Sequence, residues 1–120
     1  MIDIKNYNSE NIFSKILKKE IPSEVVYEDE DIYAFKDINP QAPIHILIIP
    51  KDPIPGMTAI MSENDRLLGH LLLVAKEIAV EEGVNDSGYR LVINSGRDAG
   101  QTVEHLHIHL LGGTTLGWPP

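Results

Sequence analysis

Apolar residues recur at helical spacing in two stretches of the chain. After a polar lead, Ser9 or Asn8 can cap a short helix that must stop before Pro22. A longer helix is predicted after Ser62, which forms an S-x-x-D capping box with Asp65, and it ends near Gly83. The apolar stripes are Ile12, Phe13, Ile16 and Leu17 in the first helix and Leu67, Leu68, Leu71, Leu72, Ala75, Ile78 and Ala79 in the second.

Five other stretches have the composition of β-strands. The first two flank an acidic turn at 28–31 and predict a hairpin, and the third is a nearly continuous apolar run interrupted by His45. Proline and glycine mark loops between the strands. Because the strands come mostly in hairpins, the pattern predicts an α+β fold with an antiparallel sheet of about five strands. The predicted strands are 25–27, 32–36, 44–49, 89–94 and 105–111.

Composition narrows the possible classes of protein. A chain of 120 residues predicts a single domain, 1–120. The net charge of −8 has the wrong sign for a nucleic-acid partner. The absence of cysteine excludes disulfides, thiolate metal sites and thiol catalysis. Residues 1–19 lack the pattern of a signal peptide and no apolar run is long enough to cross a membrane, so we expect a cytoplasmic protein with no membrane partner.

The strand at 105–111 carries the most informative pattern in the chain. His105, His107 and His109 alternate with aliphatic residues, which in an extended strand places the three imidazoles on one face. Neighbours on such a face lie about 6–7 Å apart. Histidine has an unperturbed pKa of about 6.5, so this face offers nucleophiles and proton carriers near neutral pH.

Three interpretations of this histidine face are open. Two of its histidines together with His45 can supply three imidazole ligands to a zinc ion with an open coordination position. A solvated strand face without function is the plainest alternative. The pattern favours a third interpretation, metal-free catalysis that needs no cofactor.

In the metal-free interpretation each histidine has a separate task. The central His107 attacks phosphorus or an acyl carbon, and His109 protonates the leaving group and later helps to activate water. His105 and His45 orient the nucleophile. A phosphoryl anion can be held by donors just before the strand, which are the backbone N–H groups of Gly100, Gln101 and Thr102, the Thr102 hydroxyl and the Asn94 amide.

The motifs resemble those of a known family. Residues 105–111, His-Leu-His-Ile-His-Leu-Leu, match the histidine triad (HIT) superfamily signature, in which three histidines alternate with apolar residues. Gly-Gln-Thr at 100–102, Gly-Gly at 112–113 and Trp-Pro-Pro at 118–120 are similar to the Hint branch, the histidine triad nucleotide-binding proteins. The resemblance covers nearly the whole chain and implies a HIT-like fold.

The resemblance also implies an activity and a set of roles. It implies a homodimeric purine nucleoside phosphoramidase that cleaves AMP-like substrates through a nucleotidyl-histidine on His107. His109, Asn94, Gly100, Gln101 and Thr102 would hold the phosphate and Asp37 the ribose hydroxyls. The base pocket would be lined by Ile38, Ile12, Phe13, Ile16 and Phe35. Asn11 and Ser14 stand where many members carry two zinc-binding cysteines, so we expect that structural zinc to be absent.

Two other function classes remain open. The chain can be a nucleotide-sensing adaptor with incidental catalysis, or a hydrolase of dinucleoside polyphosphates. On the long helix, Gly69 lowers helix stability and suggests close approach of another helix, as in a two-fold dimer. His70 beside it is interpreted as a surface or interface residue.

Overall fold

A computed structural model describes residues 6–120, so the first five residues of the polar lead lie outside the described part. The elements bear out the predicted α+β class, with two helices and five strands in the expected order. Three short 3₁₀ turns lie between them. The bounds are α1 Ile12–Leu17, β1 Val25–Glu28, β2 Ile32–Lys36, β3 Ile44–Pro50, α2 Asp65–Glu81, β4 Tyr89–Val92 and β5 Ile108–Gly112.

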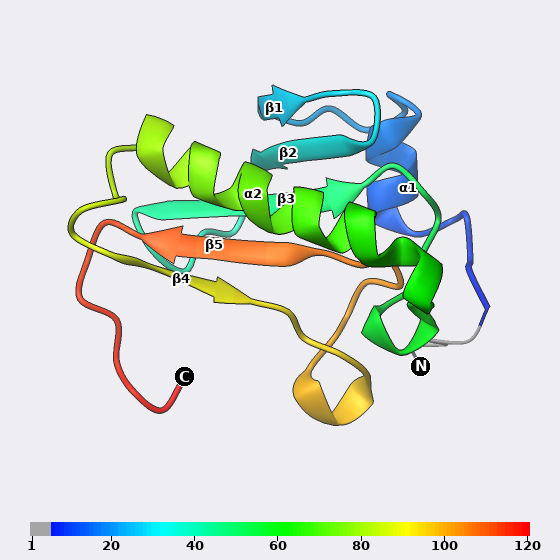
Figure 1. Cartoon of the computed structure of the whole chain (residues 1–120). Helices are drawn as coiled ribbons and strands as arrows, with labels where there is room; N and C mark the ends of the chain where they lie inside the picture. The colour runs from blue at the N-terminus through cyan, green and yellow to red at the C-terminus, as the bar shows by residue number, and fades with distance from the viewer. Residues whose placement is uncertain (1–5) are drawn as a thin grey trace.

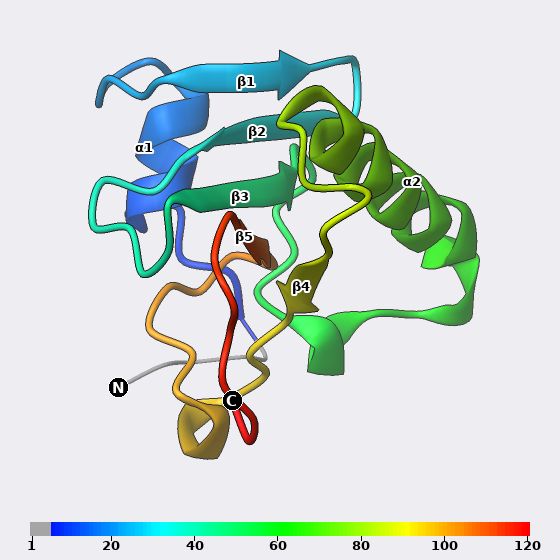
Figure 2. The same ribbon diagram turned by 90° about the vertical axis from the view of Figure 1, so that its left-hand side faces the viewer.

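The five strands form one antiparallel sheet in the order β1-β2-β3-β5-β4. Strand β3 is central, and six of its seven residues are buried, as its apolar run predicts. Figures 1 and 2 show that the two helices cover opposite faces of the sheet, with α2 on one and the short α1 on the other. The sheet therefore divides the interior into two apolar layers.

The alternation of side chains along the strands distributes residues between these layers. The α2 side is the larger layer, where Ile108 and Leu110 of β5 pack with Leu71 and Val74 of α2. The α1 side is a smaller cluster made of Phe13, Ile16, Tyr33, Phe35, Leu47 and Ile49. His105, His107 and His109 face this smaller side because they alternate with Leu106, Ile108 and Leu110 of the larger layer.

Both predicted helix caps are wrong. The N-cap of α1 is Asn11, whose side chain accepts a hydrogen bond from Ser14 N at 2.9 Å, while Asn8 caps the preceding turn. The predicted Ser62–Asp65 box does not form, because Ser62 lies inside a 3₁₀ turn and α2 begins at Asp65. The Asn64 side chain instead accepts from Met61 N at 2.9 Å. Asparagine satisfies the free N–H groups as well as serine does.

Two strands are shorter than predicted. Strand β4 ends at Val92, and β5 begins at Ile108 rather than at residue 105. The segment before β5 does not pair with a neighbouring strand, because the N–H of Leu106 donates to Ile54 O in the loop after β3, at 2.7 Å. Leu106 nevertheless lies in the α2-side layer, so the in-and-out alternation extends beyond the strand itself.

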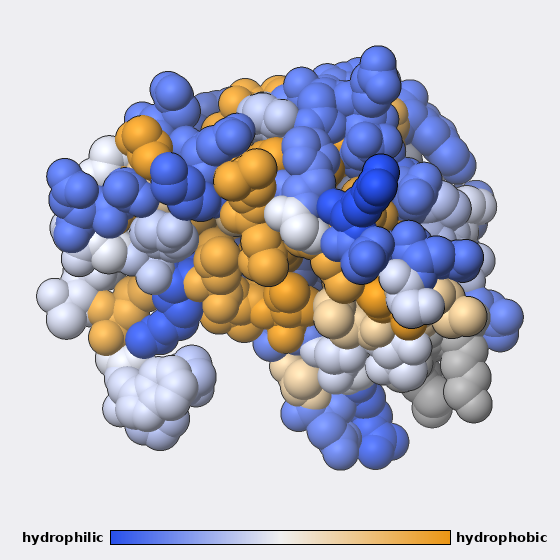
Figure 3. Space-filling view, in the orientation of Figure 1, coloured by the Kyte–Doolittle hydropathy of each residue, from blue (hydrophilic) through white to orange (hydrophobic). Residues whose placement is uncertain are grey.

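Several apolar side chains remain exposed on one face. Figure 3 shows apolar residues gathered over α2 and β4, where Leu72, Leu73, Val80 and Ile93 are 37–56% exposed. A Cβ atom added at Gly69 would meet no heavy atom within 4 Å, so the predicted close helix is not part of this chain as described. No helix among residues 6–120 is long and apolar enough to cross a membrane.

Candidate active site

A cleft of about 350 Å³ opens on the α1 side of the sheet and gathers most of the predicted site residues. Helix α1 forms one wall, the end of β2 with the following turn forms another, and the loop before β5 forms the third. His107 and His109 lie in it, whereas His105, His45 and Gln101 are buried behind its surface. The lining is Ile12, Phe13, Ile16, Ile21, Pro22, Ser23, Phe35, Lys36, Asp37, Ile38, Leu47, Asn94, Gly100, Thr102, Val103, His107 and His109.

Hydrogen bonding fixes the proton of His107. Its Nδ1 lies 2.7 Å from the backbone carbonyl oxygen of His105. A carbonyl only accepts, so Nδ1 carries the proton and donates it, which leaves the lone pair on Nε2. The ring is 5% exposed and packs edge-on against Phe13 with ring centroids 5.0 Å apart. His107 thus presents an unprotonated, held nitrogen to the cleft.

A second set of hydrogen bonds fixes His109 through His45. Gln41 N–H donates to His45 Nδ1 at 3.0 Å, so the proton of His45 is on Nε2. That Nε2 lies 2.9 Å from His109 Nδ1 and 3.4 Å from a carboxylate oxygen of Asp37. His109 Nδ1 therefore accepts, and the proton of His109 is on Nε2, facing the cleft. One backbone amide in the turn after β2 thereby orients a hydrogen-bond donor beside His107.

Burial keeps these histidines neutral. It lowers the pKa of His107 and, more strongly, that of His109, to about 4, where the neighbouring His107 and His45 add to the effect. Burial also lowers the pKa of His45, which the Asp37 carboxylate partly offsets. Near pH 7 the lone pair of His107 is consequently available for attack.

The three-imidazole metal site, the rival interpretation of the histidine face, does not assemble from His45 and two histidines of the 105–109 triplet among the described residues. The residues that converge are Asp37, His45 and His109, whose ligand atoms lie within 4.8 Å of one another, and His107 is not among them. A metal ion on His45 Nε2 would displace its proton while Nδ1 still accepts from Gln41 N–H, leaving an imidazolate. The hydrogen bonds of this cluster therefore fit a shared proton better than a metal ion.

The loop before β5 differs from prediction in how it offers its donors. Gly100 N–H donates to Arg97 O, and Gln101 N–H donates to Gly96 O. The prediction that these two N–H groups are available to a phosphoryl oxygen is therefore wrong. The Gln101 side chain is also engaged, donating to Pro55 O and Val103 O and accepting from Gly96 N. Gln101 shapes the loop from inside and does not line the cleft.

Two residues of this region keep donors directed at the cleft. Thr102 lines the cleft, and its hydroxyl and N–H make no hydrogen bond with any residue from 6 to 120. Asn94 donates one amide N–H to Ala99 O at 2.8 Å, which leaves its second N–H for a ligand. Together with His109 Nε2–H, these groups make one end of the cleft rich in donors that can hold an anion.

The predicted base pocket forms the apolar end of the cleft. Phe13, Ile16 and Phe35 are buried in the α1-side cluster, so they also serve as core. Ile38 differs sharply, because it is 90% exposed at the mouth, and Ile12 is 41% exposed. These two side chains have little packing of their own to lose when they contact a ligand.

Sequence reasoning missed Tyr7. Its hydroxyl lies 2.7 Å from His105 Nδ1, and the two rings pack edge-on with centroids 5.5 Å apart. The other ring nitrogen of His105, Nε2, lies 2.7 Å from the carbonyl oxygen of Pro50. Tyr7 and His105 are 98 positions apart, and no local sequence pattern connects them.

His70 lies outside the site and joins α2 to the β1–β2 turn. Its Nε2 is 2.7 Å from Asp29 Oδ2, which also accepts from Tyr27 OH at 2.7 Å. The other oxygen of Asp29 accepts two backbone N–H groups of the turn. These bonds hold the pKa of Asp29 well below its usual range despite the opposing effect of burial. His70 is thus a surface residue, as predicted, with a structural bond that was not predicted.

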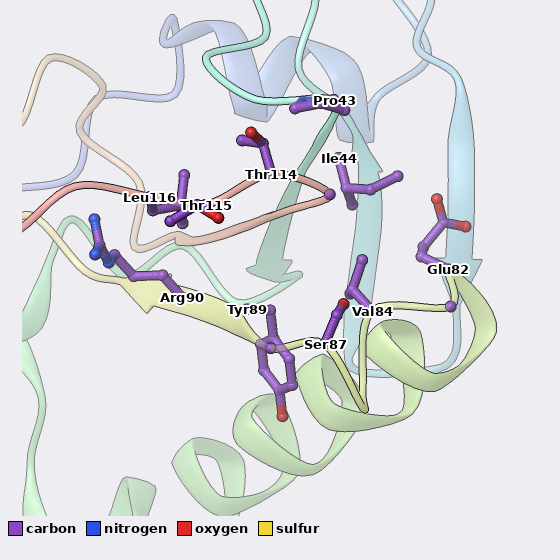
Figure 4. A pocket seen from close by; sticks show the side chains of 13 residues that line it. Pro43, Ile44, Glu82, Val84, Ser87, Tyr89, Arg90, Thr114, Thr115 and Leu116 are labelled. Atoms are coloured by element: carbon purple, nitrogen blue, oxygen red, sulfur yellow. The ribbon is translucent and has the colours of Figure 1, made fainter.

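A larger hollow, about 690 Å³, lies at the other end of the sheet and contains no histidine. Figure 4 shows its lining from the end of α2, the start of β4 and the C-terminal segment, including Glu82, Tyr89, Arg90 and Thr114. The cleft histidines described above do not line it. Size therefore does not identify the site, whereas the converging histidines do.

Comparisons with known proteins agree with this geometry. The sequence model of the HIT domain matches residues 18–116. The chain belongs to the HIT family. Purine nucleoside phosphoramidase of Escherichia coli K12 is 52% identical over 108 residues, 90% of this chain and 91% of that protein. The 14 kDa zinc-binding protein of Zea mays is 56% identical over 115 residues, 94% of this chain and 89% of that protein.

A solved structure shows the same HIT fold. The HIT family hydrolase of Legionella pneumophila Philadelphia 1 has a TM-score of 0.89 and 49% sequence identity, covering 91% of this chain and 97% of that chain. The likeness to the bacterial phosphoramidase and the maize protein assigns this HIT protein to the Hint-like branch. The predicted family and fold are therefore confirmed.

Proposed function

We propose that this HIT protein is a purine nucleoside phosphoramidase, a hydrolase that releases AMP and an amine from adenosine 5′-phosphoramidates. The observation that carries the proposal is the proton placement on the two cleft histidines. His107 Nδ1–H is held by a carbonyl and its Nε2 lone pair is free, while His109 presents Nε2–H beside it. The identity to the E. coli phosphoramidase supports the same reaction.

The cleft offers a place for each part of the nucleotide. The purine lies between α1 and Ile38, where apolar side chains stack on either face of the base. Asp37 accepts from the ribose hydroxyls, since each carboxylate oxygen keeps a lone pair beyond its contacts with Asn39 N and His45. Thr102 and the second N–H of Asn94 hold the phosphoryl oxygens. The leaving amine points out of the cleft.

The reaction proceeds in two displacements at phosphorus. His107 Nε2 attacks, the P–N bond breaks, and the amine leaves with the proton of His109 Nε2. Because the anionic phosphoryl group and Asp37 both raise the pKa of the His45–His109 pair, the neutral pair takes up one further proton when substrate binds, and it returns to its neutral form when the amine takes that proton. Water then attacks phosphorus, the bond to His107 breaks, and the proton of water returns to His109. No cofactor or metal takes part in these steps.

The test measures AMP release from adenosine 5′-phosphoramidate by the wild type and by His107→Asn, both with excess chelator. Turnover by the wild type and its loss in the variant support the proposal. A chelated wild type that is inert and recovers with zinc would support a zinc hydrolase instead. A protein that binds AMP tightly under every condition without turnover would be a nucleotide-sensing adaptor.

We also propose that the protein is a homodimer in which the exposed face of α2 and β4 contacts a second copy. That face exposes Leu72, Leu73, Val80 and Ile93, and the open space at Gly69 admits a neighbouring helix. Sedimentation velocity should give twice the chain mass for the wild type and the chain mass for Leu73→Lys. A wild-type monomer at micromolar concentration would refute this. Location in the cytoplasm stays a prediction.

A further inference from the structure

We propose that Tyr7 is a positioning residue for the reaction, acting on the nucleophile His107 through His105. The expected effect of Tyr7 on the reaction rate rests on the proposed function, whereas its expected effect on the proton of His105 does not. Tyr7 stands in the segment before α1, which the mechanism above does not use. Its hydroxyl is nevertheless bonded directly to the first histidine of the triplet, His105.

The first step of the argument is the proton of His105. Its Nε2 lies 2.7 Å from the carbonyl oxygen of Pro50, which can only accept, so Nε2 carries the proton. The ring is 0% exposed and burial keeps it neutral. Nδ1 is therefore an acceptor, and Tyr7 O–H at 2.7 Å donates to it. Among residues 6–120, Tyr7 provides the donor that this buried nitrogen needs.

The second step links His105 to the nucleophile. The backbone carbonyl of His105 is the acceptor that holds His107 Nδ1–H at 2.7 Å and so leaves the lone pair on His107 Nε2. With both ring nitrogens bonded, the His105 side chain is fixed at two ends, by Tyr7 and by Pro50. The carbonyl that orients His107 belongs to this fixed residue. Tyr7 thereby limits the motion of the group that aims the nucleophile.

The third step separates this role from simple packing. The Tyr7 ring also packs edge-on against His105, and Phe13 packs against the same imidazole at 6.4 Å between centroids. Tyr7→Phe keeps the ring and removes only the donor. Tyr27→Phe is a matched control, because Tyr27 also makes one 2.7 Å hydrogen bond, to Asp29, on the α2 side of the sheet, away from His105, His107 and His109.

The experiment combines histidine ¹⁵N NMR with single-turnover kinetics on the full chain. In Tyr7→Phe we expect the His105 Nδ1 signal to move toward that of a nitrogen without a donor, with Tyr27→Phe unchanged. Formation of the nucleotidyl-histidine should slow about fivefold, equivalent to about 1 kcal/mol for one lost hydrogen bond. The Kd for AMP should stay within twofold of the wild type.

Three results would overturn the assignment. One is a His105 ¹⁵N spectrum that does not change in Tyr7→Phe. Another is an equal loss of rate in Tyr7→Phe and Tyr27→Phe, which would show general destabilisation. The third is a shifted NMR signal with an unchanged rate, which would reduce Tyr7 to a structural residue. If the wild type does not cleave phosphoramidates, the proposed function fails, while the NMR arm still decides whether Tyr7 sets the proton of His105.

Discussion

The buried imidazole of His105 makes stability depend on pH in a way that one substitution isolates. Burial lowers its pKa in the folded protein to about 4. The unfolded chain has the ordinary histidine value of about 6.5. Between these values the unfolded state binds one more proton than the folded state, so the free energy of unfolding falls as the pH falls. Above pH 6.5 this contribution is fully present, and below pH 4 it is lost.

The magnitude follows from the difference between the two pKa values. Each unit corresponds to about 1.4 kcal/mol, so His105 alone removes about 3 kcal/mol of stability between pH 7 and pH 4. Urea unfolding of the wild type and of His105→Gln, at half-unit steps of pH, measures this. Glutamine retains an N–H for the Pro50 carbonyl but does not titrate. The other histidines titrate in both proteins, so their contributions cancel in the comparison.

We expect the variant to be less stable at pH 7 and its pH dependence to be shallower by close to one proton between pH 6 and pH 4.5. The two curves should therefore converge in acid. Parallel curves would show that His105 takes up its proton equally in both states, and the argument from its burial and its two hydrogen bonds would then be wrong. The measurement needs no substrate and does not depend on the proposed activity.

Three further predictions concern the supports of the site. Gln41→Pro removes the N–H that fixes the proton of His45, so kcat should fall at least fivefold with folding retained, whereas Gln41→Ala should keep wild-type kcat. Gln101→Leu loses three hydrogen bonds, one buried and two partly buried, and should lower the free energy of unfolding by about 3 kcal/mol, with weaker AMP binding by calorimetry. Asp29→Ala should lose about 2–4 kcal/mol at pH 7. The loss should shrink gradually as the pH falls below the ordinary carboxyl value of about 3.9, because the unfolded chain then binds a proton that folded Asp29 does not. Equal losses at pH 7 and at pH 2 would contradict this.

Local patterns predicted the elements and the histidine face, since periodicity and the residues that break it act within a few positions. The alternation at 105–111 even holds where the strand ladder does not, because Leu106 packs into the α2-side layer without pairing to β3. The place of α1 beside the histidines came from the family resemblance, because no local pattern determines which face of the sheet a helix covers.

The sequence could not predict which hydrogen-bond partner each polar atom would have. Tyr7 meets His105 from 98 positions away, and Gln101 uses its N–H groups on the loop rather than on a ligand. The proton on His45 is decided by the backbone of Gln41, which carries no residue-specific signal. The N-cap of α1 was predicted wrongly for the same reason. Asn8, Ser9 and Asn11 can all cap a helix, and only the path of the chain selects Asn11.

The two unequal layers on either side of the sheet separate the evolution of specificity from that of stability. Substitutions at Ile12 or Ile38 reshape the cleft that we propose binds a nucleotide, while the larger layer under α2 stays intact. Along β5 the division alternates residue by residue, with His109 on one side and Leu110 on the other. A library that varies only the exposed mouth residues Ile12 and Ile38 can therefore explore new ligands while both apolar layers stay intact.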